Sequence, residues 1–436
     1  MNIAIIGGGA AGMTAASRIK RLQPKWNVKV FEKSPYVSHA PCGIPFYISD
    51  VVKHFKDLCA YDITFFERER GIEIHNLSEV EEVGDGYLIA KGKEYEWDKL
   101  LFATGSKASK LNVENEDLEG ISCVNYIEHG EKVKLWAKDA EKVVIIGSGY
   151  IGVEMSEAFL RIGKKVTLIE IKEHPLPEYD AEIGAILKAE MGKYVNLRLS
   201  EKVTAFEGKD RVEKVVTNKG EYECDIAIIA VGIEPNSGLA RQFGVKLGKS
   251  KAISTNSRME TNIENVYAAG DCAESLNIIT KKMDWIPLAT PANKMGYVAG
   301  ANMAGSNMEY PGSLKSQITG FYNLEIGKAG LSEKEAVKEG YDVVSTFISS
   351  RTSAKYIPNG IIHLKMVVDR SGMVLGVQCI GKDVAKRIYG TSALLYKNAD
   401  VREFFFTDFP YYPPESRVWD PIVIAARNLF RKLGIP

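Results

Sequence analysis

The chain carries the same short pattern twice: a strand-like apolar run, then a glycine-rich turn, then a helix-forming segment. Residues 2–6 (NIAII) precede the first turn, Gly7 to Gly12. Residues 143–146 (VVII) precede the second turn, Gly147 to Gly152. Glycines at this spacing permit a tight turn and let a pyrophosphate approach the N-terminus of the following helix. The repeat predicts an α/β fold built on two Rossmann-like dinucleotide-binding domains.

An acid closes the apolar run that follows each helix-forming segment. This acid is Glu32 in residues 28–32 (VKVFE) and Glu170 in residues 166–170 (VTLIE). A carboxylate at this place accepts hydrogen bonds from ribose hydroxyls. Two such sites in one chain predict two bound dinucleotides and electron transfer between them, whereas a single glycine turn would be weak evidence.

Length and charge limit the other classes of protein. A chain of 436 residues suggests about two or three domains. Lysine plus arginine equals aspartate plus glutamate, 56 against 56, which gives no reason to expect nucleic acid or an anionic membrane as partner. No apolar run is long enough to span a membrane, and the N-terminus enters a strand without a secretory signal, so we expect a cytoplasmic protein.

The third region, from about residue 315, has a different pattern. Residues 332–335 (SEKE) form a capping box before a helix. Residues 361–369 and 373–380 are apolar runs on either side of the turn at 370–372, which predicts paired strands. We therefore expect an α+β domain with its own core.

Two further segments carry a resemblance to a known group of proteins. Residues 101–105 (LFATG) and 261–274 (TNIENVYAAGDCAE) resemble motifs of the flavoprotein reductases with two dinucleotide-binding domains, and the resemblance covers essentially the whole chain. It implies FAD in the first domain, NADH or NADPH in the second, and a C-terminal dimerisation domain that forms a homodimer, with a dimer of dimers as a further option. The implied domains are 1–112 with 238–315 for FAD, 113–237 for NAD(P)H, and 316–436 for dimerisation.

The resemblance also implies which residues hold the cofactors. Asp271 would hold the flavin ribityl chain, and Tyr150 would act as a lid on the flavin. Glu170 favours a free 2′-hydroxyl, hence NADH, although Lys172 and His174 nearby leave NADPH use open. In chain order the cofactor contacts are Gly7, Gly9, Ala10, Ala11, Gly12, Glu32, Lys33, Ala103, Thr104, Gly105, Gly147, Gly149, Tyr150, Ile151, Gly152, Glu170, Gly232 and Asp271.

One of the six cysteines stands in an unusual context, Ser-His-Ala-Pro-Cys-Gly-Ile-Pro around Cys42. Tyr47 occupies the place of the second cysteine of a CxxxxC pair, so this segment resembles the single-cysteine branch of the pyridine nucleotide-disulfide oxidoreductases. That branch includes NADH peroxidase, NADH oxidase and coenzyme A disulfide reductase. A helix that starts after Cys42 would stabilise its thiolate. The alternative is a buried structural cysteine, which we expect for Cys59.

Other positions separate the members of this branch. The peroxidase and oxidase pattern resembles a first turn with a histidine where this chain has Ala10, which disfavours peroxidase chemistry. Coenzyme A disulfide reductases have two tyrosines in the dimerisation domain, which resemble Tyr356 and Tyr411 here and would reach Cys42 of the partner subunit. The alternative for each tyrosine is an aromatic side chain packed near a proline turn.

The phosphates of coenzyme A require fixed positive charge. Arg18, Arg21, Ser38, Asn293 and Lys294 match basic or polar positions that line this pocket in the family, although a solvated helix face explains the two arginines equally well. One departure is Pro41, which precedes the cysteine where some coenzyme A disulfide reductases have asparagine.

The predicted function is an FAD-dependent NAD(P)H:disulfide oxidoreductase that reduces a small molecule, coenzyme A disulfide or a related persulfide or polysulfide, through Cys42. The first alternative is an NAD(P)H oxidase that reduces oxygen and cycles Cys42 through sulfenic acid. The second is an electron-transfer flavoprotein reductase that serves a protein acceptor such as rubredoxin.

Overall fold

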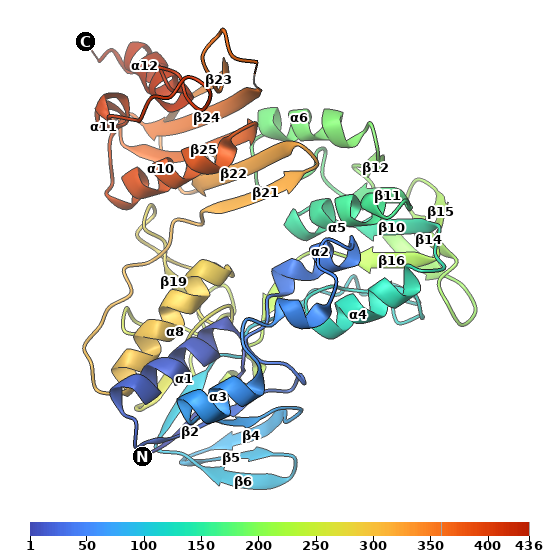
Figure 1. Cartoon of the computed structure of the whole chain (residues 1–436), viewed down its shortest axis with the longest axis vertical. Coiled ribbons are helices and arrows are strands. Elements are labelled where there is room, and N and C mark those ends of the chain that lie inside the picture. The colour runs from blue at the N-terminus through green and yellow to red at the C-terminus, as the bar shows by residue number, and fades with distance from the viewer. Residues whose placement is uncertain (359, 436) are drawn as a thin grey trace. The chain divides into compact units, whose positions relative to one another are not determined.

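The computed structural model describes residues 1–358 and 360–435 (Figure 1). The chain divides into two compact units. The first unit consists of Met1–Ser109, Asn125–Glu131 and Ile233–Ser313. The second unit consists of Lys110–Val124, Lys132–Gly232 and the chain from Leu314 onward. Each unit is built from segments that are distant in the sequence, as expected for a domain inserted into another.

A parallel sheet of five strands forms the centre of the first unit. Its strand order is β18-β7-β1-β2-β3. The strands are β1 (Asn2–Ile6), β2 (Asn27–Phe31), β3 (Glu73–His75), β7 (Lys99–Phe102) and β18 (Val266–Ala268). Strand β1 is almost entirely apolar because both faces of a parallel sheet are covered.

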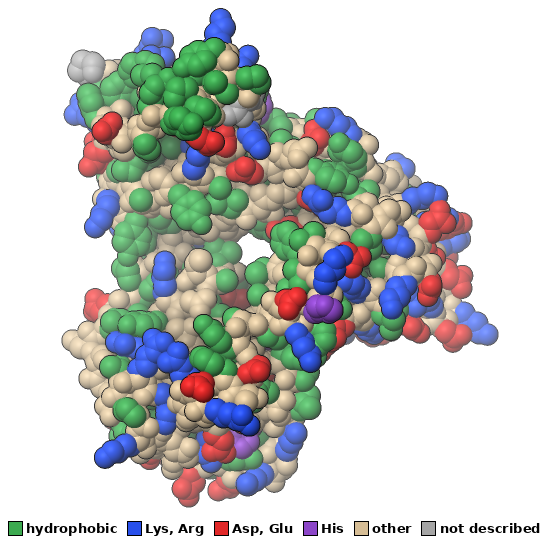
Figure 2. All heavy atoms as spheres, viewed as in Figure 1, with side chains coloured by type: hydrophobic (Ala, Val, Ile, Leu, Met, Phe, Trp, Pro, Cys, Tyr) green, Lys and Arg blue, Asp and Glu red, His purple; other side chains and the backbone are tan. Residues whose placement is uncertain are grey.

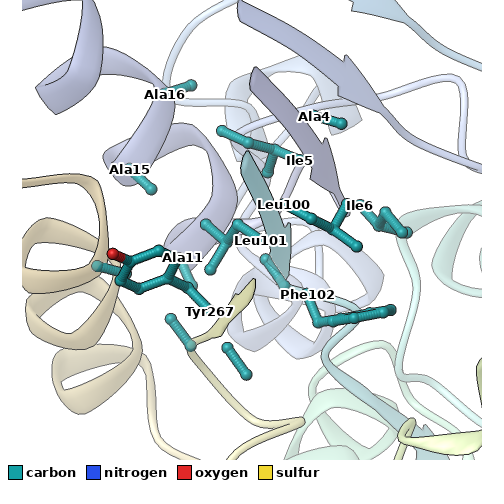
Figure 3. Packing of buried hydrophobic residues seen from close by; sticks show 14 of the residues in the cluster. Ala4, Ile5, Ile6, Ala11, Ala15, Ala16, Leu100, Leu101, Phe102 and Tyr267 are labelled. Carbon is teal, nitrogen blue, oxygen red and sulfur yellow. The ribbon is translucent and has the colours of Figure 1, made fainter. Parts of the chain in front are cut away.

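Two helices of the first unit cross at very short range, α1 (Ala10–Leu22) and α8 (Ala289–Met303). A Cβ atom on Gly296 would lie 2.2 Å from the carbonyl oxygen of Ala11, and one on Gly300 would lie 2.6 Å from that of Ala15. Only glycine at these two positions permits this approach. Figure 3 shows the core beneath, where side chains of β1, α1, β7 and β18 meet.

The first unit also contains shorter elements that complete its surface. An antiparallel sheet pairs β4, β5 and β6, and β8 pairs with β17. Their bounds, with those of the remaining elements, are η1 (Pro41–Gly43), α2 (Ile44–Ile48), η2 (Phe55–Leu58), α3 (Ile63–Arg70), β4 (Val80–Gly84), β5 (Tyr87–Ala90), β6 (Lys93–Glu96), β8 (Ser106–Ala108), β17 (Ile233–Pro235), α7 (Gly238–Gln242), β19 (Ser275–Leu276) and β20 (Met283–Asp284). Helix α4 spans Ile127–Trp136, of which residues 127–131 belong to the first unit and residues 132–136 to the second.

The second unit contains another parallel sheet, in the order β12-β11-β10-β16-β9. The elements are β9 (Ile121–Ser122), β10 (Lys142–Ile146), α5 (Tyr150–Arg161), β11 (Lys165–Glu170), α6 (Ala181–Met191), β12 (Asn196–Leu199) and β16 (Ile226–Ile229). A three-stranded antiparallel sheet accompanies it, made of β13 (Val203–Glu207), β14 (Lys214–Thr217) and β15 (Glu221–Glu223). The central order β11-β10-β16 matches β2-β1-β7, so the internal repeat of the sequence is a repeat of structure.

The C-terminal part of the second unit is an antiparallel sheet with helices, ordered β21-β22-β25-β24-β23. The strands are β21 (Gln317–Phe321), β22 (Leu324–Gly330), β23 (Val343–Arg351), β24 (Ile361–Asp369) and β25 (Val374–Gly381), and the helices are α9 (Glu333–Lys338), α10 (Val384–Tyr396), α11 (Val401–Phe406) and α12 (Pro421–Leu433). The predicted capping box is confirmed, because the Ser332 hydroxyl accepts from the Glu335 amide and Glu335 accepts from the Ser332 amide. The predicted pairing of 361–369 with 373–380 is confirmed as β24 with β25.

The α/β fold class is as predicted from the sequence, whereas the predicted boundaries near residues 112, 238 and 315 stay predictions. Within residues 1–358 and 360–435, no helix is both long and apolar enough to cross a membrane.

Candidate active site

The first glycine turn joins β1 to α1 and leaves an open place for a ligand. Gly7 has φ +109°, and a Cβ there would lie 2.1 Å from the carbonyl oxygen of Ala103. A Cβ on Gly12 would lie 1.9 Å from the carbonyl oxygen of Gly7. A Cβ on Gly9, in contrast, would meet nothing within 4 Å. Two glycines therefore close the turn, and the third leaves room for a pyrophosphate at the helix N-terminus.

Glu32 follows β2 and is buried beside this turn. Its Oε2 accepts a hydrogen bond of 2.7 Å from the Gly8 amide, and its Oε1 accepts one of 2.8 Å from the Ser34 amide. The carboxylate thus orders the glycine turn itself. Its remaining lone pairs are those that the predicted ribose contact would use.

The second glycine turn, between β10 and α5, has the same construction. Gly147 has φ +95°, a Cβ on Gly152 would lie 2.0 Å from the Gly147 carbonyl oxygen, and a Cβ on Gly149 would meet nothing within 4 Å. The buried Glu170 accepts from the Ser148 amide and hydroxyl at 2.8 and 2.7 Å. This second turn therefore fits the pyrophosphate of a dinucleotide as well as the first turn does.

Asp271 follows β18 in the first unit. The hydroxyl of Ser106, which follows Ala103, Thr104 and Gly105, donates to Asp271 Oδ2 at 3.1 Å. Burial raises the pKa of Asp271, and the hydrogen bond from Ser106 lowers it in part. The indole Nε1 of Trp285 donates to the Asp271 carbonyl at 2.6 Å. A half-buried acid that accepts one side-chain hydrogen bond from the described residues suits a polar group of a bound cofactor, such as the predicted ribityl hydroxyl.

Cys42 lies in the 3₁₀ turn η1, directly before α2, and its residue is exposed. The segment before it is fixed to the first glycine turn, because the Ser38 amide donates to the Gly8 carbonyl at 2.8 Å. The segment after it is fixed by close packing, since a Cβ on Gly43 would lie 2.4 Å from Leu58 Cδ2. Cys42 is therefore exposed, on a segment that a backbone hydrogen bond attaches to the predicted FAD turn.

Four other thiols have different environments. Cys224, Cys272 and Cys379 are buried, and burial raises the pKa of each. Cys59 is half-buried rather than fully buried, and burial together with Glu128 raises its pKa. Cys42 is thus the exposed one among these five thiols.

His39 was not predicted from the sequence as a site residue. Its Nδ1 is buried with no hydrogen-bond partner among the described residues. Burial lowers the pKa of His39, against the opposing influence of Glu32 and Glu128. A neutral imidazole therefore stands between Ser38 and Cys42 in the sequence.

The close crossing of α1 and α8 brings the predicted phosphate-binding residues together. Arg18 places its guanidinium 4.5 Å from the centre of the Tyr297 ring, and its buried Nε has no hydrogen-bond partner within the described chain. One turn earlier, the Thr14 hydroxyl donates to Asn293 Oδ1 at 2.9 Å. Arg18 is thus held by an aromatic ring rather than by a carboxylate, which leaves its charge available to an anion.

The other members of that predicted set are less constrained. Arg21 and Lys294 are exposed, on α1 and α8 respectively. Ser38 adopts a positive φ of 51° next to the glycine turn. Tyr297 was not predicted, although its spacing from Asn293 on the helix could have indicated it.

Tyr150, the predicted lid, is held in the second unit by a second tyrosine. Its hydroxyl donates to the hydroxyl of Tyr179 at 2.9 Å. Tyr179 is fully buried, and the Lys328 ammonium lies 5.6 Å from the centre of its ring. Burial raises the pKa of both tyrosines, so both are neutral. The position of Tyr150 thus depends on Tyr179, which the sequence reasoning missed.

Tyr356 and Tyr411 meet although they belong to different loops. A hydrogen bond with the Tyr356 side chain raises the pKa of Tyr411. Both side chains are largely exposed, at 72% and 50%. Figure 2 shows hydrophobic side chains gathered where α11, α12 and β23 lie in Figure 1. Exposed aromatic and aliphatic residues of this region are Phe347, Tyr356, Phe406, Tyr411, Tyr412, Val418 and Trp419.

Two family models match almost the whole chain. The model described as pyridine nucleotide-disulphide oxidoreductase matches residues 1–296, and the model of the dimerisation domain of the same family matches residues 316–421. The chain belongs to the pyridine nucleotide-disulphide oxidoreductase family. The first match includes both glycine turns, Cys42 and Asp271, and the second includes both tyrosines. The prediction of this family, and of an oxidoreductase with FAD and NAD(P)H as cofactors, is confirmed.

Individual members of the family cover the same length. A protein of Pyrococcus abyssi described as NAD(P)H sulfur oxidoreductase (CoA-dependent) is 48% identical over 436 residues, which is 98% of each chain. A NADH oxidase of Methanocaldococcus jannaschii is 33% identical over 447 residues, 100% of each. The solved structure of an NAD-dependent persulfide reductase from A. fulgidus superposes with a TM-score of 0.95 at 32% identity, over 99% of this chain and 83% of that one. Both predicted classes of enzyme, sulfur reductases and NADH oxidases, thus occur among similar proteins.

The described part of the chain offers no cluster of three or more histidine, cysteine or acidic residues that could hold a metal ion.

Proposed function

We propose that this protein uses NADH or NADPH to reduce coenzyme A disulfide, or a related persulfide or polysulfide, through the thiol of Cys42. The observation that carries the proposal is the accessible Cys42, whose segment is hydrogen-bonded to the first glycine turn by the Ser38 amide. The description of the Pyrococcus relative as a CoA-dependent sulfur oxidoreductase supports the same substrate class. Bound FAD supplies the two-electron relay between the nicotinamide and the sulfur.

In the proposed reaction, Cys42, Tyr411 and Tyr356 each have a definite role. The Cys42 thiolate attacks one sulfur of the disulfide, the S–S bond breaks, and a mixed disulfide forms between Cys42 and coenzyme A. The leaving thiolate takes a proton from Tyr411 of the partner subunit, which Tyr356 supports by its hydrogen bond. Two electrons and one further proton then convert the mixed disulfide to the Cys42 thiolate and a second thiol. One NAD(P)H is oxidised for each disulfide reduced.

Charged side chains would determine how the phosphates of coenzyme A and the nicotinamide cofactor bind. The Arg18 guanidinium, which faces the Tyr297 ring, would bind the phosphates of coenzyme A, with Arg21 and Lys294 as further cations. Glu170 favours NADH over NADPH because a 2′-phosphate would lie against a carboxylate. The protein acts as a homodimer, because each Cys42 takes its proton donor from the other subunit. A dimer of dimers and a cytoplasmic location are parts of the proposal that rest on the sequence alone.

Comparison of Cys42→Ser with Cys59→Ser tests the proposal, since both cysteines lie in the same segment of the first unit. We expect Cys42→Ser to lose NAD(P)H-dependent thiol release from coenzyme A disulfide while it still reduces oxygen to peroxide. Cys59→Ser should retain both activities. A Cys42→Ser protein that still reduces the disulfide would contradict the proposal.

The second candidate function is an NAD(P)H oxidase, favoured by the Methanocaldococcus relative. In that case wild-type protein would consume oxygen much faster than disulfide at equal concentrations, and Cys42→Ser would change the product from water to peroxide. Ala10 in the first glycine turn argues against it, because it provides no imidazole for peroxide cleavage.

A further inference from the structure

The two tyrosines of the proposed mechanism stand on two separate loops of the second unit. Tyr356 belongs to the loop after β23, and Tyr411 belongs to the segment between α11 and α12. Neither side chain is buried, so packing against a core does not determine where the hydroxyls lie. Their relative position depends on whatever holds the two loops together.

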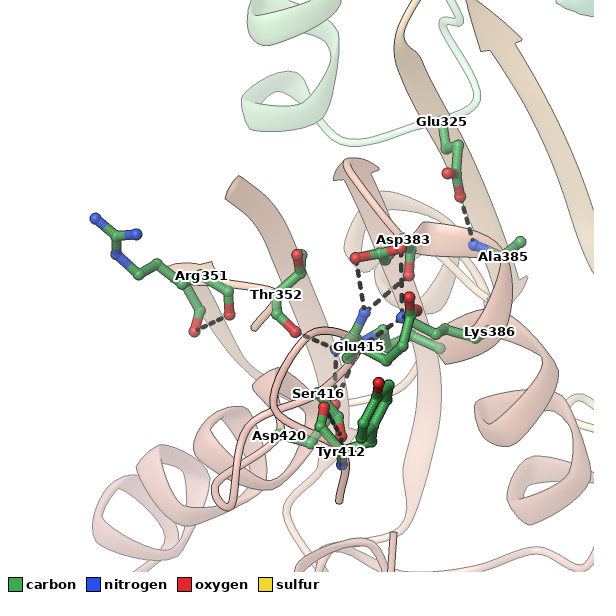
Figure 4. A network of polar contacts seen from close by, with 12 residues as sticks. Glu325, Arg351, Thr352, Asp383, Ala385, Lys386, Tyr412, Glu415, Ser416 and Asp420 are labelled. Atoms are coloured by element: carbon green, nitrogen blue, oxygen red, sulfur yellow. Dashed lines mark hydrogen bonds and ion pairs between the residues drawn. The ribbon is translucent and has the colours of Figure 1, made fainter. Parts of the chain in front are cut away.

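Arg387 holds both loops from the inside. It comes from α10, and its side chain is only 3% exposed. Its Nη2 donates to the Thr352 carbonyl at 3.2 Å, where the Tyr356 loop begins, and to Asp420 Oδ2 at 3.0 Å, where the Tyr411 segment ends. Its Nε donates to the same Asp420 oxygen at 3.2 Å. Figure 4 shows Thr352 and Asp420 converging on this network.

Asp420 transmits this constraint to the helix that follows. Its Oδ2 accepts from Arg387, while its Oδ1 accepts from the Ile422 amide at 3.0 Å and caps α12. A direct backbone hydrogen bond of 2.9 Å from the Ala354 amide to the Pro413 carbonyl then joins the two loops next to the tyrosines. One buried guanidinium therefore fixes the base of each loop.

Other charged residues reach the same loops from the solvent side. Lys386 donates to the Glu415 carbonyl and carboxylate, each at 2.7 Å, and Arg417 donates to the Ser350 hydroxyl at 2.8 Å. The Lys386 and Glu415 side chains are 38% and 62% exposed, and such exposed pairs contribute little to stability. The Arg387 and Asp420 side chains are only 3% and 9% exposed, and Asp383 Oδ2 lies farther from Arg387, at 3.9 Å. Loss of the Arg387–Asp420 contact is therefore more costly than loss of an exposed pair.

We propose that Arg387 is a positioning residue that holds the Tyr356 and Tyr411 hydroxyls in the geometry needed to protonate the leaving thiolate. This inference rests on the proposed function. In the step concerned, the S–S bond breaks as the Cys42–sulfur bond forms, and the departing thiolate gains the Tyr411 proton. The Tyr411 phenolate accepts a hydrogen bond from Tyr356 until a proton returns from water.

The test compares two disulfides that differ in their need for a proton. An alkyl disulfide such as coenzyme A disulfide leaves as a basic thiolate, whereas 5,5′-dithiobis(2-nitrobenzoate) leaves as a thiolate that is stable without protonation. Arg387→Lys keeps the charge but loses the fork of donors. We expect its kcat with coenzyme A disulfide to fall about tenfold, and that of Tyr411→Phe about a hundredfold, with the aromatic disulfide affected less than twofold in both.

Controls separate positioning from damage to the fold. Arg370→Lys, at an exposed pair with Asp342 in the same unit, should change neither rate. Arg387→Lys should also keep wild-type rates with ferricyanide, which needs no cysteine. An equal loss with both disulfides, or wild-type kcat with coenzyme A disulfide in Arg387→Lys, overturns the inference. A wild-type protein that turns over neither disulfide overturns the proposed function itself.

Discussion

Replacement of Lys365 by methionine is expected to destabilise the second unit strongly. The Lys365 side chain is 4% exposed, and its ammonium lies 2.7 Å from Glu333 Oε2, 2.9 Å from Glu182 Oε1 and 3.4 Å from Asp180 Oδ2. These carboxylates belong to the start of α6 and the start of α9, while Lys365 comes from β24. Methionine keeps the apolar stem of the lysine and removes the charge that joins the three elements.

The size of the loss in free energy of unfolding depends on which of the three carboxylates can reach water. At an effective dielectric constant of about 20, one contact of 2.9 Å contributes about 6 kcal/mol, most of which offsets the desolvation of the ammonium. Glu182 and Glu333 are 42% and 34% exposed and can turn outward, whereas Asp180 is 6% exposed and cannot. We expect the free energy of unfolding to fall by about 3 kcal/mol, the low end for a buried charge left unpaired.

The effect should depend on pH in a definite direction. Burial tends to raise the pKa of Asp180, but hydrogen bonds from the Glu333 amide and Gln378, together with Lys365, lower it overall. A carboxylate with a lowered pKa stabilises the folded state above its unfolded pKa, which is about 3.9, and this contribution is lost as the pH falls through the folded value. The difference between wild type and Lys365→Met should therefore be complete at pH 7 and shrink below about pH 4.

Urea unfolding followed by circular dichroism, at fixed protein concentration, measures this difference. Lys165→Met is the matched control, because Lys165 pairs with Glu141 on the surface, where both side chains are well exposed. The control should change the free energy of unfolding by less than about 0.5 kcal/mol. If Lys365→Met differs from the control by less than about 1 kcal/mol at pH 7, Lys365 does not stabilise the fold as a buried charge.

Three further predictions concern the cofactor turns and the thiols. Gly9→Ala should weaken FAD binding but leave the urea midpoint of the FAD-free protein unchanged, because its Cβ meets open space. Gly12→Ala should lower both the affinity for FAD and the urea midpoint. Equal effects of the two substitutions on the urea midpoint would contradict the geometry. Glu170→Ala should reduce the preference for NADH over NADPH in kcat/KM by about tenfold, the effect of one contact of ~1.4 kcal/mol; an unchanged ratio argues against a ribose contact. Cys42 should react with iodoacetamide in the native protein, while Cys224, whose pKa burial raises to about 12, should stay unlabelled in peptide maps.

The sequence predicted those parts of the fold that depend on local chemistry. Gly7, Gly12, Gly147 and Gly152 each meet a backbone atom at a distance that only glycine tolerates, so their spacing alone predicts the two turns. The Ser332 capping box is equally local, since both of its hydrogen bonds lie within one helical turn. The parallel sheets followed from the apolar runs before and after each turn.

The sequence could not predict contacts that depend on how distant elements cross. Arg18 meets Tyr297 only because α1 and α8 approach within the space left by glycines, and neither helix predicts the other. Nothing in the sequence around Arg387 distinguishes it from other arginines, yet its side chain is buried against Asp420. Tyr179, which holds the predicted lid residue Tyr150, gave no signal beyond a single aromatic in a polar segment.

Intact mass spectrometry tests directly whether Cys42 exchanges with coenzyme A disulfide. Wild-type and Cys42→Ser proteins are incubated with coenzyme A disulfide in the absence of NAD(P)H, denatured, and weighed with and without dithiothreitol. We expect one coenzyme A adduct per chain in the wild type, which dithiothreitol removes and which is absent from Cys42→Ser. An unmodified wild-type chain, or the same adduct on Cys42→Ser, would contradict this exchange.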